Sequence, residues 1–107
     1  MDMVKRFEVY FVDLNPTIGS EINKIRPAVV ISPNEMNAAL NTTIIAPLTS
    51  TLKAYPMRVN CTVDGKHGQV ALDQLRSVDK RRLKTKLGKI EDATQKDIIN
   101  SLIEMFS

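Results

Sequence analysis

Short runs of β-branched, aromatic and apolar residues, separated by turn residues, constrain the fold of this chain most. The predicted strands cover residues 8–14, 26–32, 41–48, 55–63, 69–74 and 83–90. The Asp64-Gly65 pair predicts the tight turn of a hairpin between the fourth and the fifth of these strands. Because there are too few helices to connect parallel strands, we expect the sheet to be mostly antiparallel.

Helical patterns occur in only two places. Residues 32–40 predict a short helix with Ser32 as its N-cap, since Pro33 is tolerated in a first turn. Residues 92–106 carry apolar side chains at helical spacing, at Ile98, Ile99, Leu102, Ile103 and Phe106. The pattern favours the α+β class, mainly antiparallel β: a small, partly open barrel with short helices and a C-terminal amphipathic helix packed on the sheet.

Length and composition narrow the class of protein. The 107 residues suit one domain, spanning 1–107, with a single core. The longest apolar runs are far shorter than the roughly 20 residues of a membrane helix, and no secretory signal opens the chain. We therefore expect a cytoplasmic protein with no membrane contact. Cys61 has no second cysteine to pair with, and its place in an alternating strand predicts a buried, unreactive thiol.

Two segments indicate a function. The connection at 15–27 is longer than the usual 2 to 6 residues, and long connections tend to be functional or disordered. Residues 80–89, KRRLKTKLGK, hold six of the fifteen Lys and Arg residues and no acid, so the positive charge is local although the net charge is only +3. Such a run suits a polyanion such as nucleic acid, but it also occurs as a solvated face.

Five motifs cover nearly the whole chain. They are VDLNPTIGSE, NKIRPAVVIS, APLTSTLKAYPMRV, GQVALDQLRSVDKRRL and KLGKI. In order and spacing they resemble the MazF/PemK family of toxin endoribonucleases from type II toxin–antitoxin systems. The resemblance implies an SH3-like barrel that forms homodimers and is silenced by a cognate antitoxin protein. It also implies sequence-specific cleavage of single-stranded RNA, including mRNA, with no metal and no other cofactor, which inhibits translation and growth.

The resemblance also implies roles for single residues. Arg26, before the proline, and Thr49, in PLTS, fall on catalytic positions. Glu21 and Ser20, at the end of the NPTIGSE motif, belong to the same site, with Glu21 as the candidate to orient or accept the 2′-OH proton. The further residues expected to contact substrate are Asn15, Thr17, Lys53, Arg58, Asp73, Gln74 and Arg76. The basic ones among them are alternatively contacts for the acidic tail of an antitoxin.

Three positions depart from the family pattern. Phe7 stands where many members have Gly, and Ile22 stands where Gln usually follows Ser-Glu. Ala71 stands where the PemK branch has a catalytic Arg, two residues before Asp73. The missing Arg favours the arrangement of Arg26 and Thr49, and Asp73 is kept as a secondary candidate.

The chemistry is consistent with these residues. RNA cleavage without a metal requires proton removal from a 2′-OH, stabilisation of negative charge at phosphorus, and protonation of the departing 5′-oxygen. The guanidinium of Arg26 stays charged and is planar, which suits phosphate oxygens, and the hydroxyl of Thr49 adds a neutral hydrogen bond. His67 is the one histidine, so a paired-imidazole mechanism is excluded, and its place in DGKHG predicts a solvent-exposed loop residue.

Two other functions stay open at this point. A non-enzymatic relative on the same barrel, such as a gyrase poison of the CcdB type, does not need Arg26 and Thr49. A nucleic-acid-binding module would bind phosphates through its basic strand without cutting them. The sequence does not disclose the RNA motif, the product ends or the identity of the antitoxin.

Overall fold

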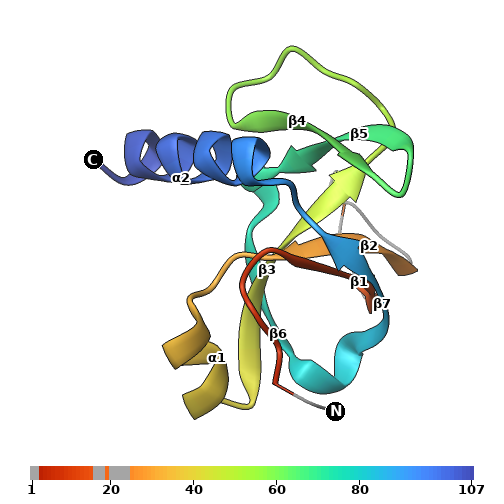
Figure 1. Cartoon of the computed structure of the whole chain (residues 1–107), viewed down its shortest axis with the longest axis vertical. Helices are drawn as coiled ribbons and strands as arrows, with labels where there is room; N and C mark the ends of the chain where they lie inside the picture. Colours follow the sequence, from red (N-terminus) through yellow and green to blue (C-terminus); the bar gives the residue numbers. More distant parts are fainter. Residues whose placement is uncertain (1–2, 16–18, 20–24) are drawn as a thin grey trace.

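The structure is a computed structural model that describes residues 3–15, 19 and 25–107. The elements are β1 (Glu8–Asp13), β2 (Ile25–Val30), α1 (Asn34–Ala39), β3 (Thr42–Thr49), β4 (Arg58–Val63), β5 (Lys66–Ala71), β6 (Arg76–Asp79), β7 (Leu83–Lys89) and α2 (Asp92–Phe106), with short 3-10 helices η1 (Leu72–Gln74) and η2 (Lys80–Arg82) on either side of β6 (Figure 1). Among the described residues, no helix is long and apolar enough to cross a membrane.

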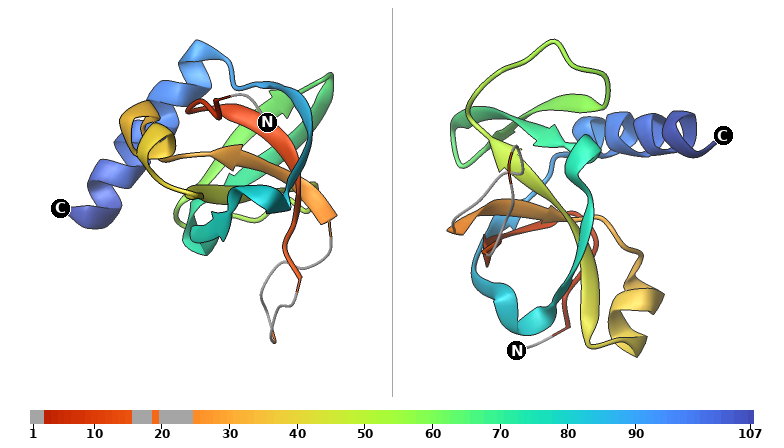
Figure 2. Two further views of the ribbon diagram at one scale, coloured as in Figure 1. Left: turned by 90° about the horizontal axis from the view of Figure 1, so that it is seen from below. Right: turned by 180° about the vertical axis from the view of Figure 1, so that it is seen from behind.

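The sheet is antiparallel at every strand pair, as predicted. Its order is β4-β5-β3-β2-β1-β7, and β6 pairs with β3 outside this path. Strand β3 is the longest: Thr42–Ile45 pairs with β6, while its last residues pair with β5. This long strand therefore joins the β4–β5 hairpin to the other half of the barrel, as Figures 1 and 2 show. The prediction of a mainly antiparallel, partly open barrel is confirmed.

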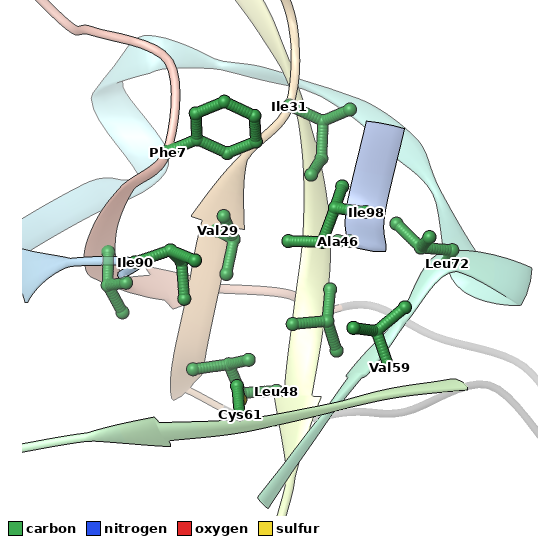
Figure 3. Close-up of a cluster of buried hydrophobic side chains, with 12 residues drawn as sticks. Phe7, Val29, Ile31, Ala46, Leu48, Val59, Cys61, Leu72, Ile90 and Ile98 are labelled. Atoms are coloured by element: carbon green, nitrogen blue, oxygen red, sulfur yellow. The ribbon is translucent and has the colours of Figure 1, made fainter. Parts of the chain in front are cut away.

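Alternate residues of the strands build two apolar clusters, one on each face. Val29 belongs to a cluster that also receives Ile98 of α2, and Figure 3 shows its side chains converging. Ala28 and Val30, its neighbours on β2, belong to the other cluster. This period of two is what a sheet buried on both faces requires. Helix α2 thus covers one face, as its amphipathic pattern predicted.

The last turn of α2 departs from the prediction. Ile103 and Phe106 were expected to pack on the sheet, but they are 61% and 75% exposed. The helix runs past the edge of the barrel, with its C-terminal end clear of the sheet (Figure 1). Helical spacing identifies the apolar side of a helix but not how far the surface beneath it extends.

Two local expectations were also wrong, and one strand was missed. Ser32 does not cap α1, because Pro33 holds the N-cap position without a side-chain hydrogen bond. The Ser32 hydroxyl instead donates to Asn37 Oδ1 in a buried polar cluster. The strand expected at 69–74 ends at Ala71 and continues as η1, and β6, a four-residue strand of mostly polar composition, was not predicted.

Candidate functional site

Arg26 and Thr49 lie on the adjacent strands β2 and β3. The paired register of β2 and β3 ends at Ala28 and Pro47, two residues from Arg26 and from Thr49. Both residues line the same cavity, whose volume is about 380 Å³. The structure therefore brings together the two residues that the sequence assigns to catalysis.

The cavity combines apolar walls with a few polar groups. Phe11, Leu48 and Leu87 contribute apolar surface, and Arg26, Thr49 and His67 are among the residues that contribute polar groups. This composition is usual for sites that bind a ligand. Arg26 is half-buried, and its guanidinium and the Thr49 hydroxyl are groups of the kind that bind an anion such as phosphate.

The end of β3 is held tightly around Thr49. Its side chain is 8% exposed, and its Oγ1 accepts a hydrogen bond from the Thr51 backbone N–H at 3.1 Å. Gly68 lies against the same residue: a Cβ atom at position 68 would be 2.8 Å from the Thr49 carbonyl oxygen. Only glycine lets β5 approach Thr49 this closely.

Gln69, which the sequence did not single out, fixes the segment that follows Thr49. Its buried Oε1 accepts from the Lys53 backbone N–H at 3.0 Å. Its Nε2 donates to the Lys53 carbonyl and to Asn60 Oδ1, both at 3.0 Å. Lys53, an expected RNA contact, is thus held by its backbone, while its Nζ lies 6.0 Å from the ring centroid of Tyr55.

Arg58 and Asp73, both expected to contact substrate, bind each other. Arg58 Nε donates to Asp73 Oδ1 at 2.6 Å and Nη2 donates to Oδ2 at 3.1 Å. The Arg58 side chain is only 8% exposed and lies over the ring of Tyr55, 5.1 Å from its centroid. The hydrogen bonds to Asp73 raise the pKa of Arg58. Neither residue is among those that line the cavity of Arg26, so their contact with RNA stays a prediction.

Arg76 and Arg82 hold the end of β1. Arg76 Nη1 donates to the Leu14 carbonyl at 2.9 Å. Arg82 Nη1 donates to the Asp13 carbonyl at 3.0 Å and also to that of Asn15. Both arginines thus fix the chain where the long connection begins.

Two further predicted site residues, Asn15 and Gln74, belong to the described part of the chain, and the others lie outside it. Asn15 donates its backbone N–H to Asp13 Oδ1 at 3.1 Å, and Gln74 is half-buried in η1. Thr17, Ser20 and Glu21 lie outside the described residues, as does Ile22.

Much of the basic run is engaged in internal contacts. Arg81 forms a bidentate pair with Asp79 at 3.0 and 3.1 Å, and Lys80 Nζ donates to the Asn37 carbonyl. Lys86 Nζ lies 2.5 Å from Glu8 Oε2. Lys80 and Lys86 thus add contacts to the barrel, whereas the Arg81 side chain is 91% exposed beside Asp79.

Cys61 and His67 both line the cavity but differ in character. Cys61 is buried as predicted, and burial raises the pKa of its thiol to about 11, while its lack of reactivity stays a prediction. His67 is exposed as predicted, but it lies on β5 rather than in the loop, with Nδ1 2.9 Å from Thr62 Oγ1. Across the described ranges, no three His, Cys, Asp or Glu side chains gather as a metal-binding group.

Comparison with known proteins gives one family and one fold. Residues 5–106 match the family described as PemK-like, MazF-like toxin of type II toxin-antitoxin system. Endoribonuclease EndoA from Bacillus subtilis is 33% identical over 96 residues, which are 84% of this chain and 83% of the relative. A crystal structure of MazF from Deinococcus radiodurans is similar at a TM-score of 0.86 and 26% identity, over 99% of this chain and 98% of that chain. An endoribonuclease from a Mycobacterial species, solved in complex with its cognate antitoxin, shares the fold at a TM-score of 0.82 and 24% identity, over 96% and 94% of the two chains.

Proposed function

Because the chain belongs to the PemK-like, MazF-like toxins of type II toxin–antitoxin systems, and is an endoribonuclease of that family, we propose that it cleaves single-stranded RNA at short sequence motifs without a metal. The observation that carries the proposal is the cavity that Arg26 and Thr49 share. A gyrase poison on the same barrel does not need this pair. Cleavage of mRNA by such an enzyme inhibits translation and growth.

In the proposed reaction, a ribose 2′-oxygen attacks the adjacent phosphorus while the bond from phosphorus to the 5′-oxygen breaks. Arg26 stabilises the extra charge on the non-bridging oxygens, and the Thr49 hydroxyl donates a hydrogen bond to the same group. The 2′-OH proton passes to a base, for which Glu21 is the candidate, and the departing 5′-oxygen takes a proton from solvent water. Full cleavage by a Glu21→Gln variant would reject the role of Glu21 as base.

The proposed partners are single-stranded RNA, a cognate antitoxin and a second copy of the chain. A single strand supplies the flexible backbone that in-line attack needs, and its unpaired bases are readable. The antitoxin is supported by the Mycobacterial complex, in which an endoribonuclease of this fold binds its own antitoxin. Dimerisation follows from the family resemblance, and light scattering at micromolar concentration measures it; a monomer would contradict it.

The test is cleavage of a defined RNA by antitoxin-free protein in the presence of a chelator. Wild type should cut it, while Arg26→Ala and Thr49→Ala should each cut at least about 100-fold more slowly, since loss of one transition-state donor has that effect. Lys96→Ala removes a cation from the exposed face of α2 and serves as the control with unchanged rate. No cleavage by wild type would overturn the proposal, and salt-dependent binding unaffected by Arg26→Ala would favour a binding module.

A further inference from the structure

A row of polar residues begins at Thr49 and continues across the next two strands. Thr49 pairs with Gln69 on β5, and Gln69 pairs with Asn60 on β4. Because opposed residues share a face, one row of polar side chains runs from β3 to the edge strand β4. Neighbouring strands lie about 4.8 Å apart, which sets the Asn60 backbone about 10 Å from that of Thr49. Figure 1 shows β3, β5 and β4 side by side at this end of the barrel.

The hydrogen bonds of Gln69 fix the orientation of the Asn60 amide. Gln69 Nε2 must be the donor toward Asn60, because the same amide accepts from the N–H and donates to the carbonyl of Lys53. Asn60 Oδ1 is therefore the acceptor, and Nδ2 points away from Gln69. Asn60 is exposed, and Nδ2 makes no hydrogen bond within the described residues. The two N–H donors of the Asn60 amide therefore lie at the surface in a fixed orientation.

A second pair of hydrogen-bonded side chains, Thr62 and His67, lies two residues further along the same face. His67 pairs with Thr62, and its Nδ1 lies 2.9 Å from Thr62 Oγ1, which leaves Nε2 as the outer edge of the ring. Asn60, Thr62 and His67 line one groove of about 510 Å³. His67 also lines the cavity of Arg26 and Thr49, so the groove and the cavity adjoin.

The groove suits a nucleobase better than a phosphate. Leu52, which is 60% exposed, adds an apolar surface to the groove, while the polar edges of Asn60 and His67 lie nearby. An unpaired base has apolar faces and a polar edge, and proteins read it through both. Glu91 also lines the groove, and its carboxylate disfavours a phosphate there.

We propose that Asn60 and His67 read one unpaired base next to the scissile phosphate and so determine which RNA sequences are cut. The Asn60 N–H groups donate to an acceptor on the base edge, and His67 Nε2 contacts the same base. The inference rests on the proposed endoribonuclease function and adds the residues that select its substrate.

Asn60→Asp tests the proposal. The aspartate keeps the oxygen that accepts from Gln69 but replaces the outward N–H donors with an acceptor. A long RNA is digested with the full-length protein, and the new 5′ ends are sequenced. We expect the preference at one position of the cleavage motif to change by about tenfold or more, as for a lost or reversed base contact, while the other positions keep their preference.

Asn100→Asp is the matched control, because it makes the same change on the exposed side of α2 and should leave the motif as in wild type. Equal relative rates at all sites for Asn60→Asp and wild type would overturn the inference and leave the nuclease intact. A uniform fall at all sites would overturn it as well, since a base contact acts on one position. No cleavage by wild type would instead overturn the proposed function.

His67→Ala is a second, independent variant. His67 is exposed, so its loss leaves the core unchanged. We expect the preference to weaken at the same position of the motif as in Asn60→Asp. An unchanged motif, or a change at a position unrelated to that of Asn60→Asp, would contradict a shared base contact.

Discussion

Gly68 shows how the absence of one side chain shapes the site. Gly68→Ala would bring a Cβ atom within 2.8 Å of the Thr49 carbonyl oxygen, which belongs to the backbone and cannot rotate away. We expect β5 and the end of β3 to separate, at a cost of about 1–3 kcal/mol in the free energy of unfolding. The kcat/KM for RNA should fall by about tenfold. Urea unfolding and a cleavage assay measure the two effects, and wild-type values for both would refute the close contact.

Sequence alone could propose Arg26 and Thr49 as site residues, because each lies in a distinctive motif, and the structure places both at one cavity. It could not identify Gly68, Gln69 or Asn60. Their roles depend on which strand lies opposite which, and register is a property of the folded sheet.

Phe7 is intelligible only with the structure. Its φ of 70° is a left-handed conformation, which glycine adopts freely and a bulky residue does not. The Phe7 ring is buried in the apolar cluster that Figure 3 shows, so its packing offsets the strain of its backbone. A glycine at this position would adopt this φ without strain, whereas in this chain the buried Phe7 ring compensates for the strain.

The segment between β3 and β4 is neither helix nor strand, and hydrogen bonds from Gln69 to the Lys53 backbone fix its position. Gln69→Leu removes the partners of both the Lys53 N–H and the Lys53 carbonyl. We expect the amide hydrogen of Lys53 to exchange about 10- to 100-fold faster, since loss of these bonds removes about 1–3 kcal/mol of local protection. Asn60→Ala, which keeps both bonds, is the control. Equal exchange in Gln69→Leu and wild type would show that the segment is held by something else.

Strands with strong apolar patterns were predictable as elements, and β6 was not. Its sequence, Arg76–Asp79, has one buried residue, Val78, so its own pattern is weak. It forms a strand because it pairs with the start of β3. The strand predicted at 69–74 was too long because the polar Asp73 and Gln74 turn into η1. Short, polar elements depend on tertiary contacts more than on local sequence.

The buried carboxylate of Glu8 ties the stability of the whole molecule to pH. Burial alone would raise the pKa of Glu8, but hydrogen bonds from Lys86, the Lys5 backbone and Tyr10 lower it below its usual range. A lowered folded pKa means that the stabilisation is present above the ordinary glutamate pKa of about 4.3 and is lost as the pH falls through the folded value. Acid should therefore weaken the contact between β1 and β7.

Glu8→Gln tests whether the Glu8 carboxylate makes the stability of the fold depend on pH. At pH 7 the variant should be about 1–3 kcal/mol less stable than wild type in urea unfolding, because charge-assisted hydrogen bonds are lost. The difference should shrink as the pH is lowered below about 4. Glu104→Gln, on the exposed side of α2, should differ from wild type by less than about 0.5 kcal/mol throughout. A constant difference across the pH range would show that Glu8 acts by packing rather than by charge.

The position of β1 between β2 and β7 has a consequence for the time course of synthesis. Strand β7 pairs with β1 but is made long after it, and so are Arg76 and Arg82, which hold the end of β1. Pairing between segments so distant in the chain is slow to form. During synthesis, β1 therefore has no partner on its β7 side until residues 83–89 have left the ribosome, and the barrel around Arg26 and Thr49 closes only after that point.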